Sequence, residues 1–199
     1  MITPEAGSSL AAVSSPARRL ATWADIAAFP EGTRAEILDG QVVVAPSPSP
    51  RHQGIGSRLL RRIGGPFDED DTPGGWWILH EVDVELGPHR VVQPDVAGWR
   101  RTRVPGYPTE QPIRTVPDWI CEILSPSNAG RDRIVKAAIY LDSGVPFLWF
   151  ADPEERLLEA FEAREGAWVR LGAWGNGDVA RIAPFEAVEL EVSRLFPPA

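Results

Sequence analysis

Three charged residues in this sequence have the types and the spacing that phosphoester chemistry requires. Asp95 follows a proline in the run VVQPDVAGW, Glu122 lies inside the apolar run WICEIL, and Lys136 follows in the run RDRIVKAAIY. Two carboxylates on neighbouring strands can hold one divalent cation such as Mg²⁺ or Mn²⁺, because these ions prefer oxygen ligands. A nearby ammonium can orient a water molecule or stabilise developing negative charge. Together the three residues indicate a metal-dependent hydrolytic site.

Glu122 is the residue that most needs a partner. Residues 119–124 are apolar on both faces, which predicts a strand buried in the middle of a sheet. An unpaired carboxylate buried there costs several kcal/mol. A cation shared with Asp95 offsets that cost, and the backbone carbonyl of Ile123 could add a third oxygen. The alternative is an ion pair with a basic side chain from elsewhere, such as Arg131 or Arg133.

Lys136 is the only lysine among 20 basic residues, the others all being arginine. A lysine ammonium and an arginine guanidinium are not interchangeable where a compact charge is needed, so the single lysine is a candidate for chemistry. Its alternative role is a surface ion pair with Asp132, four residues earlier, worth only a few tenths of a kcal/mol. Asp95 could likewise be an ordinary residue in a turn at the end of a strand.

The apolar periodicity and the turn residues predict an α/β protein with one central mixed sheet flanked by helices. A helix is expected from Thr22, as N-cap with Asp25 in a capping box, to Pro30. The other expected elements are helices at 50–64 and 130–142, strands at 34–39, 41–45, 76–86, 91–99, 118–125 and 146–152, a hairpin about Glu165-Gly166, a weak strand pair at 179–182 and 186–192, and loops at 66–75 and 100–117.

The strand–helix–strand unit of residues 118–152 determines where the three charged residues meet. A right-handed crossover would make its two strands parallel and bury both of their faces, as their continuous apolar runs suggest. The helix between them packs on the sheet, and side chains three or four residues apart share one face of it. The strip that carries Lys136 can therefore lie over the strand end that carries Glu122.

Length and composition favour one domain, residues 21–199, after a flexible tail of residues 1–20. The single cysteine, Cys121, excludes an internal disulfide and favours a reducing, cytoplasmic setting. No apolar stretch approaches the roughly 18 residues that span a bilayer, so no membrane association is expected, and the N-terminus lacks the pattern of a signal peptide. The net charge of −8 argues against binding nucleic acid by overall electrostatics. Any contact with DNA must then depend on a local patch or on metal ions.

Other kinds of site find little support. The three histidines do not have the spacing of a zinc site, and neither a phosphate-binding P-loop nor a dinucleotide-binding glycine motif occurs. Two alternatives to a nuclease remain open: a non-catalytic module that binds nucleic acid or protein, and a hydrolase acting on another phosphate or small substrate. The arginines that could grip DNA, or could simply be solvated surface charges, are Arg51, Arg58, Arg61, Arg62, Arg100, Arg101, Arg103 and Arg114.

Four motifs, in this order, resemble the Uma2 family of restriction endonucleases, which have the PD-(D/E)XK nuclease fold. They are RAEILDGQVVVAPSPSPRHQ, VVQPDVAGW, PDWICEILSPSN and RDRIVKAAIYLDSGVPFLWFADPE, and the resemblance extends from about residue 22 to about residue 163. It implies a restriction endonuclease-like core and a Mg²⁺- or Mn²⁺-dependent endonuclease that acts on DNA. A homodimer is also expected, because cutting both strands of a duplex needs two sites.

The resemblance also implies roles for individual residues. Asp95 and Glu122 match the two acidic positions that hold the metal, together with the carbonyl of Ile123. The strand lysine of the fold is replaced here by Leu124, and Lys136 on the following helix takes its place.

Two further catalytic or substrate-binding positions follow from the first motif. Glu36 matches an early glutamate that can join the metal site, and His52, in the PRHQ stretch, is a substrate-binding candidate along with Arg100 and Arg101. Glu36 could instead face solvent, and His52 could instead cap its helix.

Overall fold

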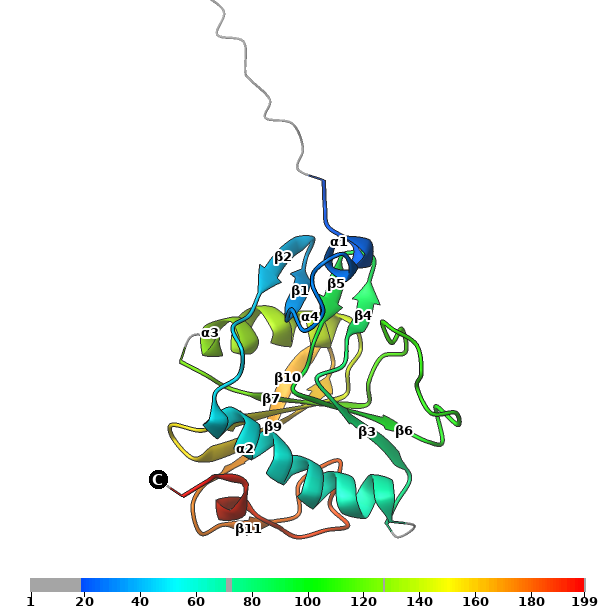
Figure 1. Ribbon diagram of the computed structural model, residues 1–199. Helices are drawn as coiled ribbons and strands as arrows, with labels where there is room; N and C mark the ends of the chain where they lie inside the picture. The colour runs from blue at the N-terminus through cyan, green and yellow to red at the C-terminus, as the bar shows by residue number, and fades with distance from the viewer. Residues whose placement is uncertain (1–18, 71–72, 127, 199) are drawn as a thin grey trace, which may run out of the picture.

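The computed structural model describes residues 19–70, 73–126 and 128–198, and a six-stranded mixed sheet forms its centre (Figure 1). The strand order is β10-β9-β8-β7-β6-β3, and every neighbouring pair is antiparallel except β7 and β8, which are parallel as predicted for the crossover unit. The strands are β3 (Trp76–His80), β6 (Val96–Arg100), β7 (Trp119–Ile123), β8 (Phe147–Asp152), β9 (Leu157–Arg164) and β10 (Ala167–Trp174).

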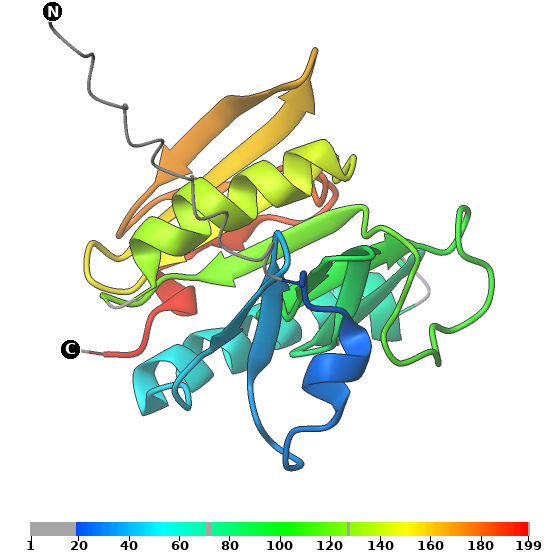
Figure 2. The same ribbon diagram turned by 90° about the horizontal axis from the view of Figure 1, so that it is seen from above.

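Helices cover both faces of this sheet. One face carries α2 (Pro50–Leu59) and its continuation η1 (Leu60–Glu69). The other carries the continuous helix formed by α3 (Ala129–Arg131), η2 (Asp132–Lys136) and α4 (Ala137–Asp142), which lies over the sheet in Figure 2. Alternate residues of β7 point to opposite faces. Trp119, Cys121 and Ile123 pack in the core beside α2, whereas Ile120 packs beside α4. Glu122 therefore points toward α4.

The predicted central mixed sheet flanked by helices is confirmed, and a second sheet of four strands, which the sequence did not predict, packs beside it. Its order is β2-β1-β5-β4, and its strands are β1 (Ala35–Leu38), β2 (Gln41–Val44), β4 (Val84–Gly87) and β5 (Arg90–Val92). The predicted long strands 76–86 and 91–99 each break in the middle and contribute one half to each sheet. Glu81 has a positive φ of 51°, and Pro94 has no N–H to donate to a strand ladder. Both segments therefore leave the larger sheet beside each other, next to the pair His80 and Val96.

The predicted helices occur, but two of them contain wider turns than an α-helix. The helix expected at 50–64 extends to Glu69 as the π-type segment η1, which includes Pro66, so the predicted loop at 66–75 is partly helical. A proline disrupts the usual hydrogen bond to the fourth preceding residue, and wider winding accommodates it. The helix at 130–142 is confirmed, and Gly144, with φ of 84°, ends it. Its middle turn, η2, is also of the π type.

Other local predictions are confirmed. Helix α1 (Trp23–Ala27) begins with the capping box, since the Thr22 N–H donates to Asp25 over 2.7 Å. The Asp39-Gly40 and Glu165-Gly166 turns have the positive φ values that tight hairpins need. The C-terminal elements are β11 (Val179–Ala180), β12 (Leu190–Glu191) and the 3₁₀ turn η3 (Val192–Leu195).

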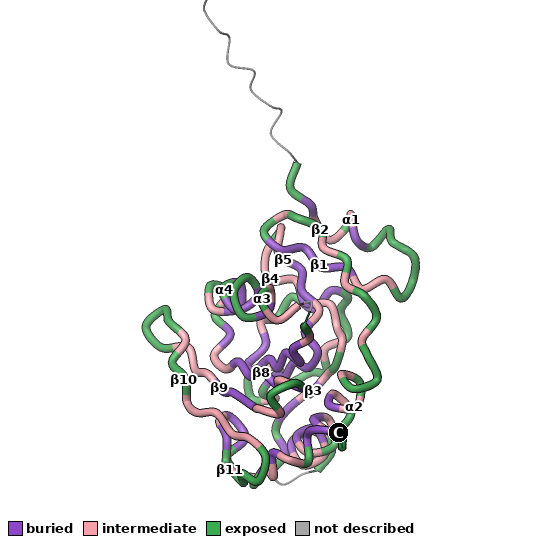
Figure 3. Tube along the Cα trace, turned by 90° about the vertical axis from the view of Figure 1, so that its left-hand side faces the viewer, coloured by how far each residue is buried: buried purple, intermediate pink, exposed green. Residues whose placement is uncertain are grey.

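Burial is concentrated in the central strands, whereas the tip of the β9–β10 hairpin is exposed (Figure 3). Within the described ranges, no helix is long and apolar enough to cross a membrane. The predicted N-terminal tail lies almost wholly outside the described residues.

Candidate active site

A pocket of about 260 Å³ opens beside the end of β7, between the start of β1, the N-terminus of α2 and the turn η2. The acidic residues and the lysine that the sequence predicts as site residues all line this pocket. Other residues, which the sequence did not predict, line it as well. The charged and histidine side chains that line it are Arg34, Glu36, His52, Asp95, Glu122, Arg131, Asp132 and Lys136.

Asp95 occupies the break between β5 and β6, where the chain passes from one sheet to the other. Pairing of β6 with β7 begins at Val96 opposite Cys121, so the N–H of Ile123 lies beyond the ladder and donates instead to Asp95 Oδ2 over 2.7 Å. The other oxygen, Oδ1, accepts from Arg34 over 3.3 Å and lies 2.9 Å from His52 Nε2. Burial alone would raise the pKa of Asp95, but His52, the charge of Lys136 and the Ile123 N–H outweigh it and lower that pKa.

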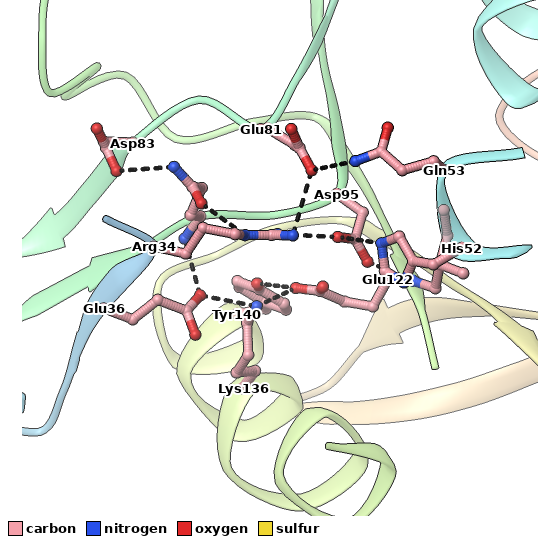
Figure 4. A network of polar contacts seen from close by, with 12 residues as sticks. Arg34, Glu36, His52, Gln53, Glu81, Asp83, Asp95, Glu122, Lys136 and Tyr140 are labelled. Atoms are coloured by element: carbon pink, nitrogen blue, oxygen red, sulfur yellow. Dashed lines mark hydrogen bonds and ion pairs between the residues drawn. The ribbon is translucent and has the colours of Figure 1, made fainter. Parts of the chain in front are cut away.

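Glu122 is 2% exposed, and its partners come from the helix packed above it (Figure 4). Its Oε1 accepts from Lys136 Nζ over 2.7 Å and also from the hydroxyl of Tyr140. The predicted alternative partners are not used, since Arg133 pairs with Asp152 and Glu159. Burial raises the pKa of Glu122 well above its usual range, and neighbouring carboxylates add to this, while Lys136 opposes it.

Lys136 bridges two glutamates rather than pairing with Asp132 on the surface. Its Nζ lies 2.7 Å from Glu122 Oε1 and 2.8 Å from Glu36 Oε1, and the residue is 3% exposed. Burial would lower the pKa of Lys136, but the surrounding carboxylates, Glu122 first, raise it well above its usual value. Lys136 is therefore an ammonium at neutral pH. It is the last residue of the wide turn η2, a kind of winding often found at functional sites.

Glu36, on β1, and Arg34, one residue before that strand, reach the pocket on the same side of the chain because they are two residues apart. Glu36 is 6% exposed and accepts from the Gln93 N–H over 2.8 Å, so the alternative that it faces solvent is wrong. Arg34 contacts Gln93, Asp95 and Glu81, and it thereby holds together the two chain segments that pass between the sheets. The sequence prediction missed Arg34, although its two-residue spacing from Glu36 was a usable signal.

His52 contacts Asp95 and does not cap its helix. The cap of α2 is Ser49, whose Oγ accepts from the His52 N–H over 3.2 Å. The imidazole is thus left to approach Asp95. This orientation follows from the start of the helix at Pro50, because a residue in the first turn projects toward the pocket beside the N-terminus.

Asp132 is a pocket residue that the sequence suggested only as an ion-pair partner of Lys136. It is 7% exposed, and its carboxylate makes no hydrogen bond or close ion pair within the part of the chain that the structure describes. Burial, with the nearby charges of Asp95 and Glu36, raises its pKa to about 6, while Lys136 and Arg131 oppose this. Its spacing of four residues from Lys136 was the signal that both share a helix face.

The sequence and the fold both match known proteins. A family model, Uma2, described as "Putative restriction endonuclease", matches residues 20–193. The chain belongs to the Uma2 family. A solved structure from Anabaena variabilis, described as "a putative nuclease belonging to DUF820", has a TM-score of 0.70 and 19% sequence identity, covering 88% of this chain and 97% of that one. This likeness confirms the predicted restriction endonuclease-like fold. No curated protein matches the sequence.

Arg100 and Arg101 of this Uma2 protein lie away from the pocket. Asp95 precedes β6 and Arg100 ends it, so the two are separated by the length of the strand. The guanidinium of Arg100 lies 4.5 Å from the Trp76 ring, and that of Arg101 lies 3.8 Å from the Trp77 ring. Arg101 also pairs with Asp68 over 2.8 Å. Neither residue contacts the site, and DNA binding by them stays a prediction.

The chemistry of the pocket suits a divalent cation. Four buried carboxylates, those of Glu36, Asp95, Glu122 and Asp132, surround the single buried ammonium of Lys136. Over the described ranges, no three or more His, Cys, Asp or Glu side chains are grouped as a ready-made metal site. A site with so few converging protein ligands is compatible with Mg²⁺, which commonly binds through one or two carboxylates while keeping several waters or substrate oxygens.

Proposed function

We propose that this Uma2 protein is a metal-dependent endonuclease that hydrolyses phosphodiester bonds in DNA. The observation that carries the proposal is the convergence of Asp95, Glu122, Glu36 and Lys136 on one pocket, from four separate parts of the chain. The descriptions of the family and of the Anabaena structure support the same class of activity.

The residues that would hold Mg²⁺ or Mn²⁺ are Asp95 and Glu122, with the carbonyl of Ile123. In a strand, the N–H and C=O of one residue point to the same side, so the Ile123 carbonyl faces the gap where its N–H meets Asp95. Glu122 Oε1 is already occupied by Lys136 and Tyr140, which leaves Oε2 for an ion. When bound, such an ion neutralises negative charge on the phosphate and lowers the pKa of a coordinated water.

The protein's own groups position the substrate and compensate charge. Lys136 supplies a fixed ammonium that can stabilise the negative charge developing on the phosphate. Glu36 holds that ammonium from the opposite side, so its position does not depend on Glu122 alone. Arg34 and His52 fix the orientation of the Asp95 carboxylate. This relocated lysine is the part of the proposal that most needs a direct test.

Substitution of Glu122 by alanine tests the proposed activity. We expect wild-type protein to nick supercoiled plasmid with Mg²⁺ or Mn²⁺, and Glu122→Ala to be slower by at least about 10²-fold, the typical cost of losing a group that stabilises the transition state. The matched control is Glu186→Ala, an exposed glutamate after the Phe185 turn. The proposal is wrong if Glu122→Ala cleaves as fast as the wild type.

Arg100 tests whether the loop after β6 grips DNA. Both arginines lie over a tryptophan ring, but Arg101 also pairs with Asp68, whereas Arg100 is exposed, so the charge of Arg100 is the more available. We expect Arg100→Glu to weaken DNA binding and to flatten its dependence on salt, because each lost phosphate contact reduces counterion release. Fluorescence anisotropy over a salt series measures both. Arg164→Glu, at the exposed end of β9, is the control, and equal loss in both variants would indicate only a net-charge effect.

A non-catalytic binding module is the second candidate. It is favoured by the engagement of Asp95 and Glu122 with donors from the protein itself, and by the net charge of −8. Isothermal titration with Mn²⁺ and with duplex DNA distinguishes the two functions, since binding of both without cleavage would indicate the module. Assembly as a homodimer and a cytoplasmic location stay predictions.

A further inference from the structure

Asp132 differs from the other three buried acids of the pocket in its hydrogen bonds. Asp95 is contacted by three donor groups, and Glu36 and Glu122 each accept from two. Asp132, equally buried at 7% exposure, accepts from none among the residues that the structure describes. Its oxygens are not among the fully buried atoms that lack a partner, so they reach the open space of the pocket, where a ligand or a water molecule can meet them.

The placement of Asp132 relates it to the proposed reaction. It begins the wide turn η2 that Lys136 ends, and both residues line the same pocket. The charged groups around it come from three directions: Glu36 from β1, Asp95 from the passage between the sheets, and Lys136 and Arg131 from its own helix. Asp132 is thus near the lysine without being bound by it.

The other groups of the pocket are poorly suited to take a proton. Lys136 is held as an ammonium by the carboxylates around it, and so it has no free lone pair. Asp95 has a lowered pKa and is contacted by three donor groups, and one oxygen of Glu122 is shared by Lys136 and Tyr140. His52 has its Nε2 directed at Asp95, which leaves only its Nδ1 as a possible proton acceptor, and the His52→Gln variant below tests that alternative. A general base must have both a free lone pair and a suitable pKa.

We propose that Asp132 is the catalytic residue that accepts a proton from the water that attacks the phosphodiester. The proposal rests on the proposed nuclease function. The water oxygen forms a bond to phosphorus, and one of its O–H bonds breaks, with that proton passing to a carboxylate oxygen of Asp132. The bond from phosphorus to the leaving oxygen breaks, and its electron pair stays on that oxygen, which takes a proton from solvent. Asp132 then returns its proton to solvent.

The acidity of Asp132 suits this role. A base works best when its pKa lies near the working pH, since it is then both deprotonated and able to hold a proton. Burial, followed by the charges of Asp95 and Glu36, raises the pKa of Asp132 to about 6. An ordinary aspartate, with a pKa near 3.8, would be a much weaker base. The burial that raises the pKa of Asp132 therefore suits its carboxylate to accept a proton near neutral pH.

The test compares Asp132→Asn with Asp132→Glu and with the control Asp142→Asn. Asp142 lies on α4, at the other end of the same helix, and its exposed carboxylate pairs with Arg90. The probes are Mn²⁺ binding by titration calorimetry, thermal unfolding, and single-turnover cleavage of a labelled duplex from about pH 5 to about pH 9. We expect Asp132→Asn to cleave about 10²–10⁴ times more slowly than the wild type. Its pH–rate profile should lack the acid limb, which is the fall of the cleavage rate below about pH 6 in the wild type. Its Mn²⁺ binding should match that of the wild type. Asp132→Glu should retain part of the rate with a shifted limb, and Asp142→Asn should match the wild type.

Three results would overturn the assignment, and they can be told apart. Retention of the acid limb in Asp132→Asn would exclude Asp132 as the base, and its loss in His52→Gln instead would assign the role to the imidazole. Loss of Mn²⁺ binding in Asp132→Asn, with a normal melting temperature, would make Asp132 a metal ligand. Absence of cleavage by the wild type would reject the nuclease function and this step together, whereas the first two results leave the nuclease function standing.

Discussion

Replacing Lys136 with methionine is expected to slow DNA cleavage by two to three orders of magnitude, about 10²–10³-fold, and at the same time to strengthen Mn²⁺ binding. The ammonium lies within 2.8 Å of both Glu36 and Glu122, so it occupies carboxylates that a divalent cation also needs. Methionine fills a similar buried volume without charge. Loss of the group that stabilises the developing charge should slow cleavage about 10²–10³-fold. Titration calorimetry and plasmid nicking measure the two effects, and tighter binding with slower cleavage would separate the lysine's chemistry from metal affinity.

The same substitution should make the stability of the protein depend on metal. Leaving two carboxylates buried without their cation costs about 3–5 kcal/mol of unfolding free energy. Glu122 already has a raised pKa, so without Lys136 it gains a proton more readily, and the loss should be smaller at acidic pH than at pH 8. Mn²⁺ should restore stability in Lys136→Met by more than it stabilises the wild type. Denaturant unfolding with and without Mn²⁺ checks this, and equal stabilisation of both proteins would show that the ion does not take the place of the ammonium.

The part of the site built on the strand–helix–strand unit could be predicted from the sequence. The apolar run around Glu122 predicts a central strand, and the parallel pairing of β7 with β8 requires a helix across the sheet. Side-chain periodicity then brings Lys136 over Glu122. These are local signals, and they combine into a tertiary contact because a crossover allows few arrangements.

The second sheet was not predicted, because the two breaks that create it lie inside apolar segments that otherwise have the composition of strands. Apolar residues lie on both sides of Glu81 and Asp95, so each sequence segment predicts one long strand. Pro94 is the one sign of a break in the sequence, whereas Arg34, which contacts Glu81, Gln93 and Asp95, joins the two broken segments from a different part of the chain. A contact between distant residues of common types leaves no periodic signal, and the bond from Tyr140 to Glu122 was missed for the same reason.

Substitution of Asp95 by asparagine should remove both metal binding and much of the stability around the site. The change keeps the shape of the side chain but removes the charge that is contacted by Arg34, His52 and the Ile123 N–H. Hydrogen bonds to charged groups contribute about 1.5–3 kcal/mol each, so the unfolding free energy at neutral pH should fall by at least about 2 kcal/mol. Cleavage should fall at least about 10²-fold, because one of two metal carboxylates is lost.

The pH dependence of this loss has a definite sign. The pKa of Asp95 is lowered in the folded protein below its ordinary value of 3.8, so its ionised form favours folding. That stabilisation is complete above about pH 4 and is lost as the pH falls through the folded pKa, since both states are then protonated. The difference in stability between wild type and Asp95→Asn should therefore be constant near neutrality and shrink in acid. A difference that grew in acid would show that loss of the ionised Asp95 carboxylate is not the cause of the destabilisation.

Asp118→Asn is the control that separates stability from function. Asp118 is also 8% exposed and accepts hydrogen bonds from an arginine side chain, Arg103, and from a backbone N–H, that of Arg100, but it does not line the pocket. We expect Asp118→Asn to lose a similar amount of unfolding free energy while keeping Mn²⁺ binding and cleavage at temperatures where it is folded. If both variants lost activity in proportion to stability, Asp95 would be a structural acid at the junction of the sheets. If only Asp95→Asn lost Mn²⁺ binding, the carboxylate that joins the two sheets would also be the one that holds the ion.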